Sequence, residues 1–273
     1  MILPKQTPKV PGKLSFAEIF DLLEEKARQY NRPEFIATDP IQIPRQFGQK
    51  ENIEIAGFLA ATIAWGQRPT IIKNANRLMV GMEHDPYSFL MNTGENDWSH
   101  FAEFKHRTFN GVDCLFFFKS LKNIYQNYGG LEAVFTDGFL AEGTVAGALR
   151  NFRRIFFEVD HQKRSQKHIS NIDRGASAKR LNMFLRWMVR KDEAGVDFGI
   201  WNRIPMSELL LPLDVHTSRQ ARQLGLLHRK QDDWRAVLEV SERLREFDPA
   251  DPVKYDFALF GLGAFESSAS PFG

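Results

Sequence analysis

Two residues of opposite charge, Lys179 and Asp214, each stand where the sequence predicts the start of a helix. The helix dipole disfavours a cation in a first helical turn, and this favours the neutral amine, which is a nucleophile. An aspartate at a helix start accepts hydrogen bonds from the free N–H groups of the turn, so Asp214 is predicted to be an N-cap. A carboxylate fixed opposite an amine would also assist its deprotonation and stabilise a developing positive charge. The simpler alternative for Lys179 is an exposed cation with no chemical role.

The surroundings of Lys179 are basic. Twelve Lys and Arg residues lie between Arg150 and Lys191, against three acidic residues. Such clusters are common on solvated helix faces, and the alternative is a phosphate-binding surface. The net charge of the whole chain, +2, does not by itself indicate a nucleic-acid-binding protein. Gly175 ends the segment before the helix, and Ser177 is predicted to cap it.

Helical periodicity dominates the remaining sequence, and we predict an all-α fold. Ser15 and Glu18 form a capping box before FAEIFDLLEEKARQY, and the nearly apolar NIEIAGFLAATIAW indicates a buried central helix. Paired glycines end the helix predicted in VDCLFFFKSLKNIYQNYGG. Further helices are predicted at TIIKNANRLMVGM and over residues 145–159, 178–189, 214–224, 233–247 and 254–261.

No boundary divides the sequence into independent domains, so we predict one domain over residues 1–273. Residues 1–49 are predicted to hold an N-terminal helix and a connector, because the segment 33–48 is rich in proline and glycine. The core is predicted over residues 50–265, followed by a tail at 266–273.

Several classes of protein are excluded by composition. Cys114 is the single cysteine, so the chain forms no internal disulfide and no four-cysteine zinc or iron–sulfur site. The start MILPKQTPKV does not look like a signal peptide, and the most apolar segment, Ile55 to Trp65, is too short to cross a bilayer. We therefore expect a soluble, cytoplasmic protein without a membrane partner.

Gly175, Lys179 and the stretch PLDVHTSRQARQLGL together resemble the helix-hairpin-helix DNA glycosylase superfamily, which includes endonuclease III and the 8-oxoguanine glycosylases. In that superfamily a lysine follows the hairpin turn, and the aspartate that matches Asp214 is catalytic. The segments IEIAGFLAATIAWGQRP, HRTFNGVDCLFFFKSLKNIY and YDFALFGLGAF look like helices of the 8-oxoguanine branch, so the resemblance covers residues 50–265. The separation of Lys179 and Asp214 is closest to that of the archaeal enzymes, and GASAK keeps one of the two usual hairpin glycines. The stretches KRLNMFLRWMVR, DFGIW and YDFALFGLG are also similar to a bacterial family of unknown function.

The resemblance implies two closely packed helical lobes and an enzyme of base-excision DNA repair. Lys179 would expel the base and form a Schiff base that permits strand cleavage, and Asp214 would assist it. The implied partner is double-stranded DNA with a damaged base, such as 8-oxoguanine or another oxidised purine, with no cofactor, metal or obligate protein partner. The residues expected to contact DNA are Gln67, Arg174, Gly175, Ser177 and Arg180. The candidates for the base pocket, each of which would otherwise be a core residue, are Trp65, Phe184, Trp187 and Trp201.

Two other functions remain open from the sequence. The first is a non-catalytic nucleic-acid-binding protein on the same scaffold, which would tolerate the loss of Lys179 and Asp214. The second is a helical interaction protein with no nucleic-acid role, for which DNA binding would be absent or insensitive to salt.

Overall fold

The computed structural model describes residues 14–266, and within this range the all-α prediction is confirmed. Apart from Glu266, the tail predicted at 266–273 lies outside the described residues. None of the helices between residues 14 and 266 is both long enough and apolar enough to span a membrane.

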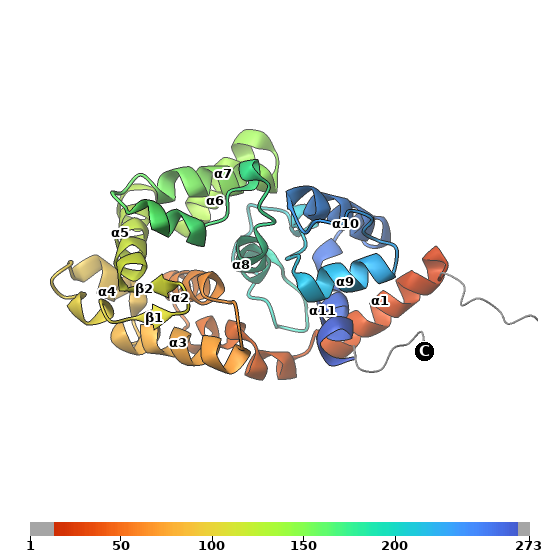
Figure 1. The fold of residues 1–273 in the computed structure, drawn as a ribbon, viewed down its shortest axis with the longest axis horizontal. Coiled ribbons are helices and arrows are strands. Elements are labelled where there is room, and N and C mark those ends of the chain that lie inside the picture. The colour runs from red at the N-terminus through yellow and green to blue at the C-terminus, as the bar shows by residue number, and fades with distance from the viewer. Residues whose placement is uncertain (1–13, 267–273) are drawn as a thin grey trace, which may run out of the picture.

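The helices form two groups on either side of α8 (Lys179–Val189), as Figure 1 shows. The first group is one continuous stretch of chain, and the second combines the N-terminal helix with the C-terminal helices. The first group consists of α2 (Lys50–Thr62), α3 (Arg68–Gly81), α4 (Pro86–Asn92), α5 (Gly111–Asn127), α6 (Leu131–Glu142) and α7 (Val145–Phe156). The second consists of α1 (Phe16–Tyr30), α9 (Val215–Gln223), α10 (Trp234–Phe247) and α11 (Tyr255–Phe265).

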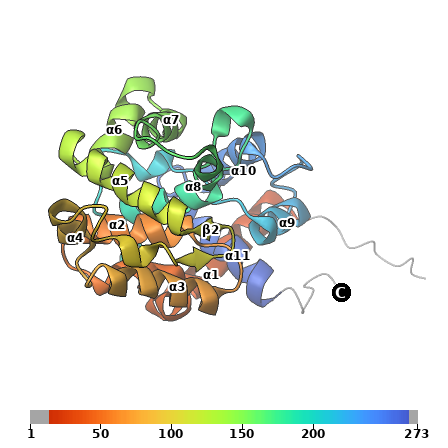
Figure 2. The same cartoon turned by 60° about the vertical axis from the view of Figure 1, so that its left-hand side comes forward.

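Helix α1 packs along α11, so the first and last helices of the described chain lie side by side (Figures 1 and 2). The ring of Tyr30 stacks on Phe265 with centroids 5.6 Å apart. Gly261 permits this close approach, because a Cβ atom there would lie 2.0 Å from the Tyr30 ring. The capping box of Ser15 and Glu18 is confirmed at the start of α1.

The proline-rich connector is not a loose linker. It forms three consecutive 3₁₀ helices, η1 (Pro33–Thr38), η2 (Pro40–Gln42) and η3 (Pro44–Gln46), each of which begins with a proline. Proline suits this position because the first N–H groups of a helix have no partner within it. Since η2 and η3 pack against α2, the N-terminal piece is part of the same folded body as the core.

The core of the first group is built from phenylalanine rings. The predicted central helix α2 is confirmed, with almost every residue buried, and its Phe58 contacts the rings of Phe117, Phe152 and Phe184. These contacts extend the core into α8, which is therefore anchored in the first group along its length.

Helices α4 and α6 and a short β ribbon were not predicted from the sequence. Helix α4 has only seven residues, and the apolar residues of α6 are spread around the helix instead of forming one stripe. A short antiparallel ribbon joins β1 (Lys105–His106) to β2 (Phe109–Asn110) just before α5.

Candidate active site

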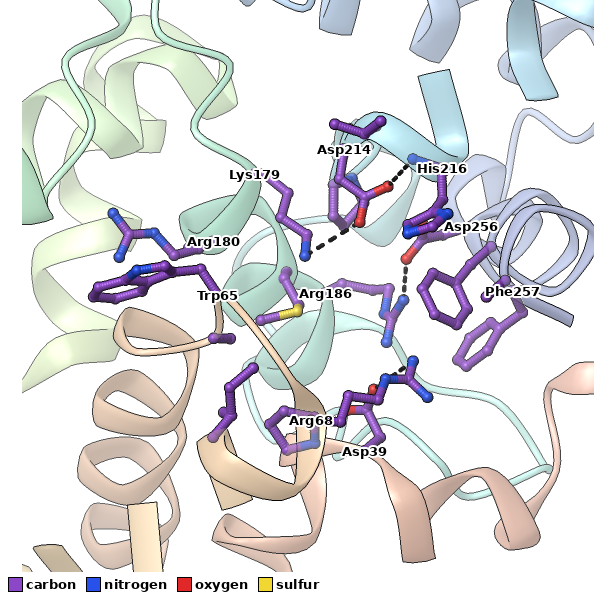
Figure 3. A pocket seen from close by; sticks show the side chains of 18 of the residues that line it. Asp39, Trp65, Arg68, Lys179, Arg180, Arg186, Asp214, His216, Asp256 and Phe257 are labelled. Carbon is purple, nitrogen blue, oxygen red and sulfur yellow. Dashed lines mark hydrogen bonds and ion pairs between the residues drawn. The ribbon is translucent and has the colours of Figure 1, made fainter. Parts of the chain in front are cut away.

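The structure brings Lys179 and Asp214 together, although 35 residues separate them in the chain. Lys179 is the first residue of α8, and Asp214 is the N-cap of α9. Their side chains form an ion pair with Nζ and Oδ2 3.4 Å apart, as Figure 3 shows. Both side chains are partly exposed, at 30% and 21%, so solvent and a bound molecule can reach the pair.

The two oxygens of Asp214 have separate partners. Oδ1 accepts hydrogen bonds from the backbone N–H groups of His216 at 2.9 Å and Thr217 at 3.0 Å, which confirms the predicted N-cap. The hydroxyl of Thr217 accepts a hydrogen bond from the Asp214 N–H and completes the cap. Oδ2 is thus left to face Lys179. Burial raises the pKa of Asp214, but the charge of Lys179 and these N–H groups outweigh burial and lower it overall, so the carboxylate stays ionised.

The turn before α8 differs from the prediction. Ser177 does not cap the helix: the N-cap is Ala178, in the left-handed conformation with φ of 53° and without a side-chain cap. Gly175 is also left-handed, with φ of 85°, which glycine adopts without strain. The first hydrogen bond at the start of α8 runs from the N–H of Asn182 to the carbonyl of Ala178, so the N–H groups before it precede the helical ladder.

Lys179 and Asp214 lie on a cleft of about 780 Å³ between the two groups of helices. Trp65 and Arg180 lie at one end of the view in Figure 3, and Phe257 lies at the other. On α8, Lys179, Met183 and Arg186 all line the cleft, because residues four and seven positions apart share one helix face.

The floor of the cleft contains a buried ion pair that the sequence analysis missed. Arg186 of α8 pairs with Asp256 of α11, and its Nε donates to Asp197 Oδ1 at 3.2 Å. The Arg186 guanidinium also lies 4.4 Å from the centroid of the Phe257 ring. Burial raises the pKa of Asp256 to about 6, with Arg186 opposing the shift and Asp214 adding to it. The signal in the sequence was the placement of Arg186 among the apolar residues of a helix, with Arg190 four residues later at its end.

A second acid, Asp39, lies on the opposite side of the floor. Its Oδ1 accepts a hydrogen bond from the N–H of Ile41 at 3.0 Å, and its Oδ2 lies 3.6 Å from Nη2 of Arg68. Burial raises the pKa of Asp39. Arg68 lies over the Phe260 ring at 4.6 Å, so the floor presents two acids, two guanidinium groups and aromatic faces.

Three of the four aromatic residues predicted for a base pocket do not line the cleft. Phe184, Trp187 and Trp201 are buried in the core, where Trp201 donates its indole N–H to Glu54 at 2.7 Å and contacts the ring of Phe184. Trp187 follows Lys179 by eight residues and was expected on the same helix face, but its ring is buried in the core and does not line the cleft. Only Trp65 lines the cleft.

The residues predicted to contact DNA have mixed positions. Ser177 and Arg180 line the cleft, and Arg174 is exposed beside Gly175. The guanidinium of Arg180 is already used within the protein, because it donates to the carbonyls of Thr62 and His168 and lies 4.8 Å from the centroid of the Trp65 ring. Gln67 is exposed at the start of α3 and does not line the cleft.

The basic segment from Arg150 to Lys191 is not one continuous phosphate-binding face. Arg150 pairs with Glu142 and Asp173, and Arg164 pairs with Asp113. Arg186 and Arg190 are buried. Between residues 14 and 266, no group of three or more His, Cys, Asp or Glu side chains is arranged to hold a metal ion.

Comparison with protein families places the chain in the family described as Protein of unknown function (DUF2400), which matches residues 39–265. The match includes every residue that lines the cleft except Phe35, with Asp39 at its beginning and Phe265 at its end. No curated protein matches the chain, and neither does any solved structure.

Proposed function

We propose that the protein is a DNA glycosylase with abasic-site lyase activity, in which Lys179 is the nucleophile and Asp214 assists it. The observation that supports this most directly is the ion pair of Lys179 and Asp214 at two helix N-termini, partly open to a large cleft. A purely structural ion pair has no need of such a cleft beside it.

In the proposed reaction, one proton passes from Lys179 Nζ to Asp214 Oδ2 and frees the amine. The amine forms a bond to C1′ of the damaged nucleotide, and the bond from C1′ to the base breaks. The electron pair leaves with the base, which takes up the proton from Asp214. Asp214 is then ionised again and stabilises the positive charge that develops on the sugar.

The lyase step follows from the same bond between Nζ and C1′. Opening of the sugar ring breaks the C1′–O4′ bond, O4′ takes up the proton that Nζ gives up, and a protonated Schiff base remains. Loss of a proton from C2′ and departure of the 3′ phosphate then cleave the strand. No metal or cofactor is part of this proposal.

Contacts to the DNA backbone would come from two helix starts. The positive ends of the α8 and α9 dipoles both face the cleft, and the first N–H groups of α8 lie before its hydrogen-bond ladder. The exposed Arg174 and the half-buried Ser177 flank this turn. We infer that the turn from Gly175 to Ala178 grips a phosphate despite its single glycine.

The floor of the cleft supports an oxidised purine as the substrate base. Asp39 and Asp256 accept hydrogen bonds or, when protonated, donate them, and Arg68 and Arg186 donate. A purine such as 8-oxoguanine carries both donors and acceptors around its ring edge, and Phe257 and Phe260 offer apolar surface for its face. We place this activity on double-stranded DNA in the cytoplasm.

Borohydride trapping tests the proposal. The purified protein is mixed with duplexes that carry either an abasic site or 8-oxoguanine, in parallel with Lys179→Gln. We expect a covalent adduct with the natural protein and none with Lys179→Gln. Salt-sensitive DNA binding without any adduct on either duplex would instead support a non-catalytic binding protein.

A further inference from the structure

Asp197 lies in the segment between α8 and α9, outside the cleft, and its side chain is fully buried. It is the shared partner of two arginines on α8. Oδ1 accepts a hydrogen bond from Nε of Arg186 at 3.2 Å, and Oδ2 accepts one from Nη1 of Arg190 at 3.0 Å. The carboxylate thus joins a cleft residue, Arg186, to a residue farther from the cleft, Arg190.

Arg186 has little freedom in this arrangement. Its Nε is fixed by Asp197, its Nη1 pairs with Asp256, and its flat face lies against the Phe257 ring. Only Asp256 and Phe257 of these partners belong to the cleft lining. Arg186 therefore sets the orientation of the Asp256 carboxyl in the cleft, and Asp197 sets the orientation of Arg186. Asp197 does not line the cleft, so a bound base would not contact it.

Arg190 also has a partner other than Asp197, namely Asp251. Its Nε donates to Asp251 Oδ1 at 3.0 Å, and its Nη2 donates to Asp251 Oδ2 at 2.8 Å. Asp251 is buried like Asp197 but has no bond to Arg186. The two acids belong to one cluster, yet only Asp197 connects it to the floor of the cleft.

We propose that Asp197 is a positioning residue for base recognition: through Arg186 it fixes the Asp256 carboxyl in the orientation that reads a flipped-out base. The inference rests on the proposed glycosylase activity. Since an abasic site has no base to be read, strand cleavage at an abasic site depends on Lys179 and not on the floor. Loss of Asp197 should therefore separate the two halves of the reaction.

The charges around Asp256 give this role a second consequence. Asp256 faces Arg186 and Lys179 from α8, Asp214 from α9 and Asp197 from the intervening segment. The negative charge of Asp197 raises the pKa of Asp256, and the positive charge of Arg186 lowers it. Removal of the Asp197 charge should shift the acidic limb of the pH profile for base excision to lower pH, and leave that for abasic-site cleavage in place.

The experiment compares Asp197→Ala and Asp197→Asn with the matched control Asp251→Ala in the full chain. Single-turnover rates are measured on an abasic duplex and on the duplex that the natural protein excises best among oxidised purines. Both alanine variants should melt at lower temperature, because each removes one carboxylate partner from a buried arginine. Asp197→Ala should reduce base excision by about 10- to 100-fold while abasic-site cleavage stays within about threefold, and Asp251→Ala should leave the ratio of the two rates unchanged. Asp197→Asn keeps one hydrogen-bond acceptor and should recover part of the excision rate.

Equal effects of Asp197→Ala and Asp251→Ala on the ratio of the two rates would overturn the inference. A crystal structure of Asp197→Ala in which Arg186 and Asp256 keep their positions would also overturn it, whatever the substrate. If the natural protein cleaves neither duplex and forms no adduct, it is the glycosylase proposal itself that fails.

Discussion

Helix α8 carries two kinds of ion pair that differ in almost every physical respect. At its N-terminus, Lys179 meets Asp214 through one contact of 3.4 Å, and both side chains are partly exposed. Two turns later, Arg186 and Arg190 are shared among several acids, and their side chains are at most 5% exposed. The first pair is held by a single contact, and the second cluster is fixed from several sides.

This difference in exposure sets the free-energy cost of breaking each ion pair, because water can solvate a separated charge only where the side chain is accessible. Breaking an exposed pair costs about 0–1 kcal/mol, since solvent takes up both charges. Removing one partner from a buried pair costs about 3–5 kcal/mol, since the remaining charge is stranded. Lys179 can therefore leave Asp214 at little cost in free energy, as the proposed role of a nucleophile requires, while Arg186 and Arg190 are held rigidly. The predictions below test this division between a reactive pair and a supporting cluster.

The largest effect is expected for Lys179→Gln. It removes the proposed nucleophile, so strand cleavage at an abasic site should fall by at least about 10³-fold. Its free energy of unfolding should change by less than about 1 kcal/mol, because the lost ion pair is partly exposed and water can solvate Asp214. Cleavage time courses and urea denaturation measure the two quantities. A fall in stability comparable with that of a core variant would show that Lys179 is a structural residue.

The opposite result is expected for Arg190→Met. This change removes the arginine partner of Asp251 and one of the two arginine partners of Asp197, so the free energy of unfolding should fall by about 3–5 kcal/mol. Abasic-site cleavage by the folded protein should stay within about threefold of the natural rate, because Arg190 does not line the cleft. Urea denaturation and single-turnover cleavage at low temperature measure these effects. A fall in the cleavage rate larger than the fall in the amount of folded protein would contradict the division between a reactive pair and a supporting cluster.

Asp214→Asn separates the two proposed roles of this side chain, which are capping α9 and assisting Lys179. Asparagine caps a helix about as well as aspartate, so the bonds from Oδ1 to the His216 and Thr217 N–H groups should persist with a stability change below about 1 kcal/mol. Strand cleavage should fall by about 10²-fold, because an amide neither accepts the lysine proton nor balances a cationic sugar. Asp233→Asn, which alters the N-cap of α10, is the control for capping alone. Full activity in Asp214→Asn would reduce Asp214 to a cap.

The ion pair of Lys179 and Asp214 could be predicted from the sequence. The position of Asp214 before a helix predicts its cap, and the resemblance to glycosylases predicts its encounter with Lys179. The cap of α8 was missed because Ala178 adopts a left-handed conformation that its residue type does not indicate.

The supporting cluster could not be predicted in the same way. Arg186 meets Asp197 from a neighbouring loop and Asp256 from α11, and only the packing of α8, α11 and the loop brings these charges together. Trp187 illustrates the converse error, because an aromatic residue at helical spacing from Lys179 is as consistent with a core as with a pocket. Sequence patterns report the burial of a helix face, but they do not report which other segment covers it.

The smallest effect concerns a buried acid that belongs to neither region. Glu54 on α2 is 2% exposed and accepts hydrogen bonds from Tyr125 at 2.6 Å and Trp201 at 2.7 Å, while its cation, Lys50, is 3.8 Å away and 45% exposed. Burial raises the pKa of Glu54 to about 7, and the two hydrogen bonds only partly oppose this. Glu54 therefore tests what happens to a buried charge without the close partners that Arg186 and Arg190 have.

Because its pKa is higher in the folded state than in the unfolded chain, Glu54 stabilises the fold most when it is protonated. This contribution is complete below the ordinary glutamate pKa and is lost as the pH rises through about 7. Relative to Glu54→Gln, the natural protein should lose on the order of 1–3 kcal/mol of stability between pH 5 and pH 8. Urea denaturation of both proteins at the two pH values measures this difference, with Glu132→Gln, which removes another acid paired with Lys50, as the control. The same pH dependence in the natural protein and in Glu54→Gln would mean that Glu54 stays ionised in the fold. In that case the hydrogen bonds from Tyr125 and Trp201, with Lys50 at 3.8 Å, would stabilise a buried charge as well as the arginine cluster does.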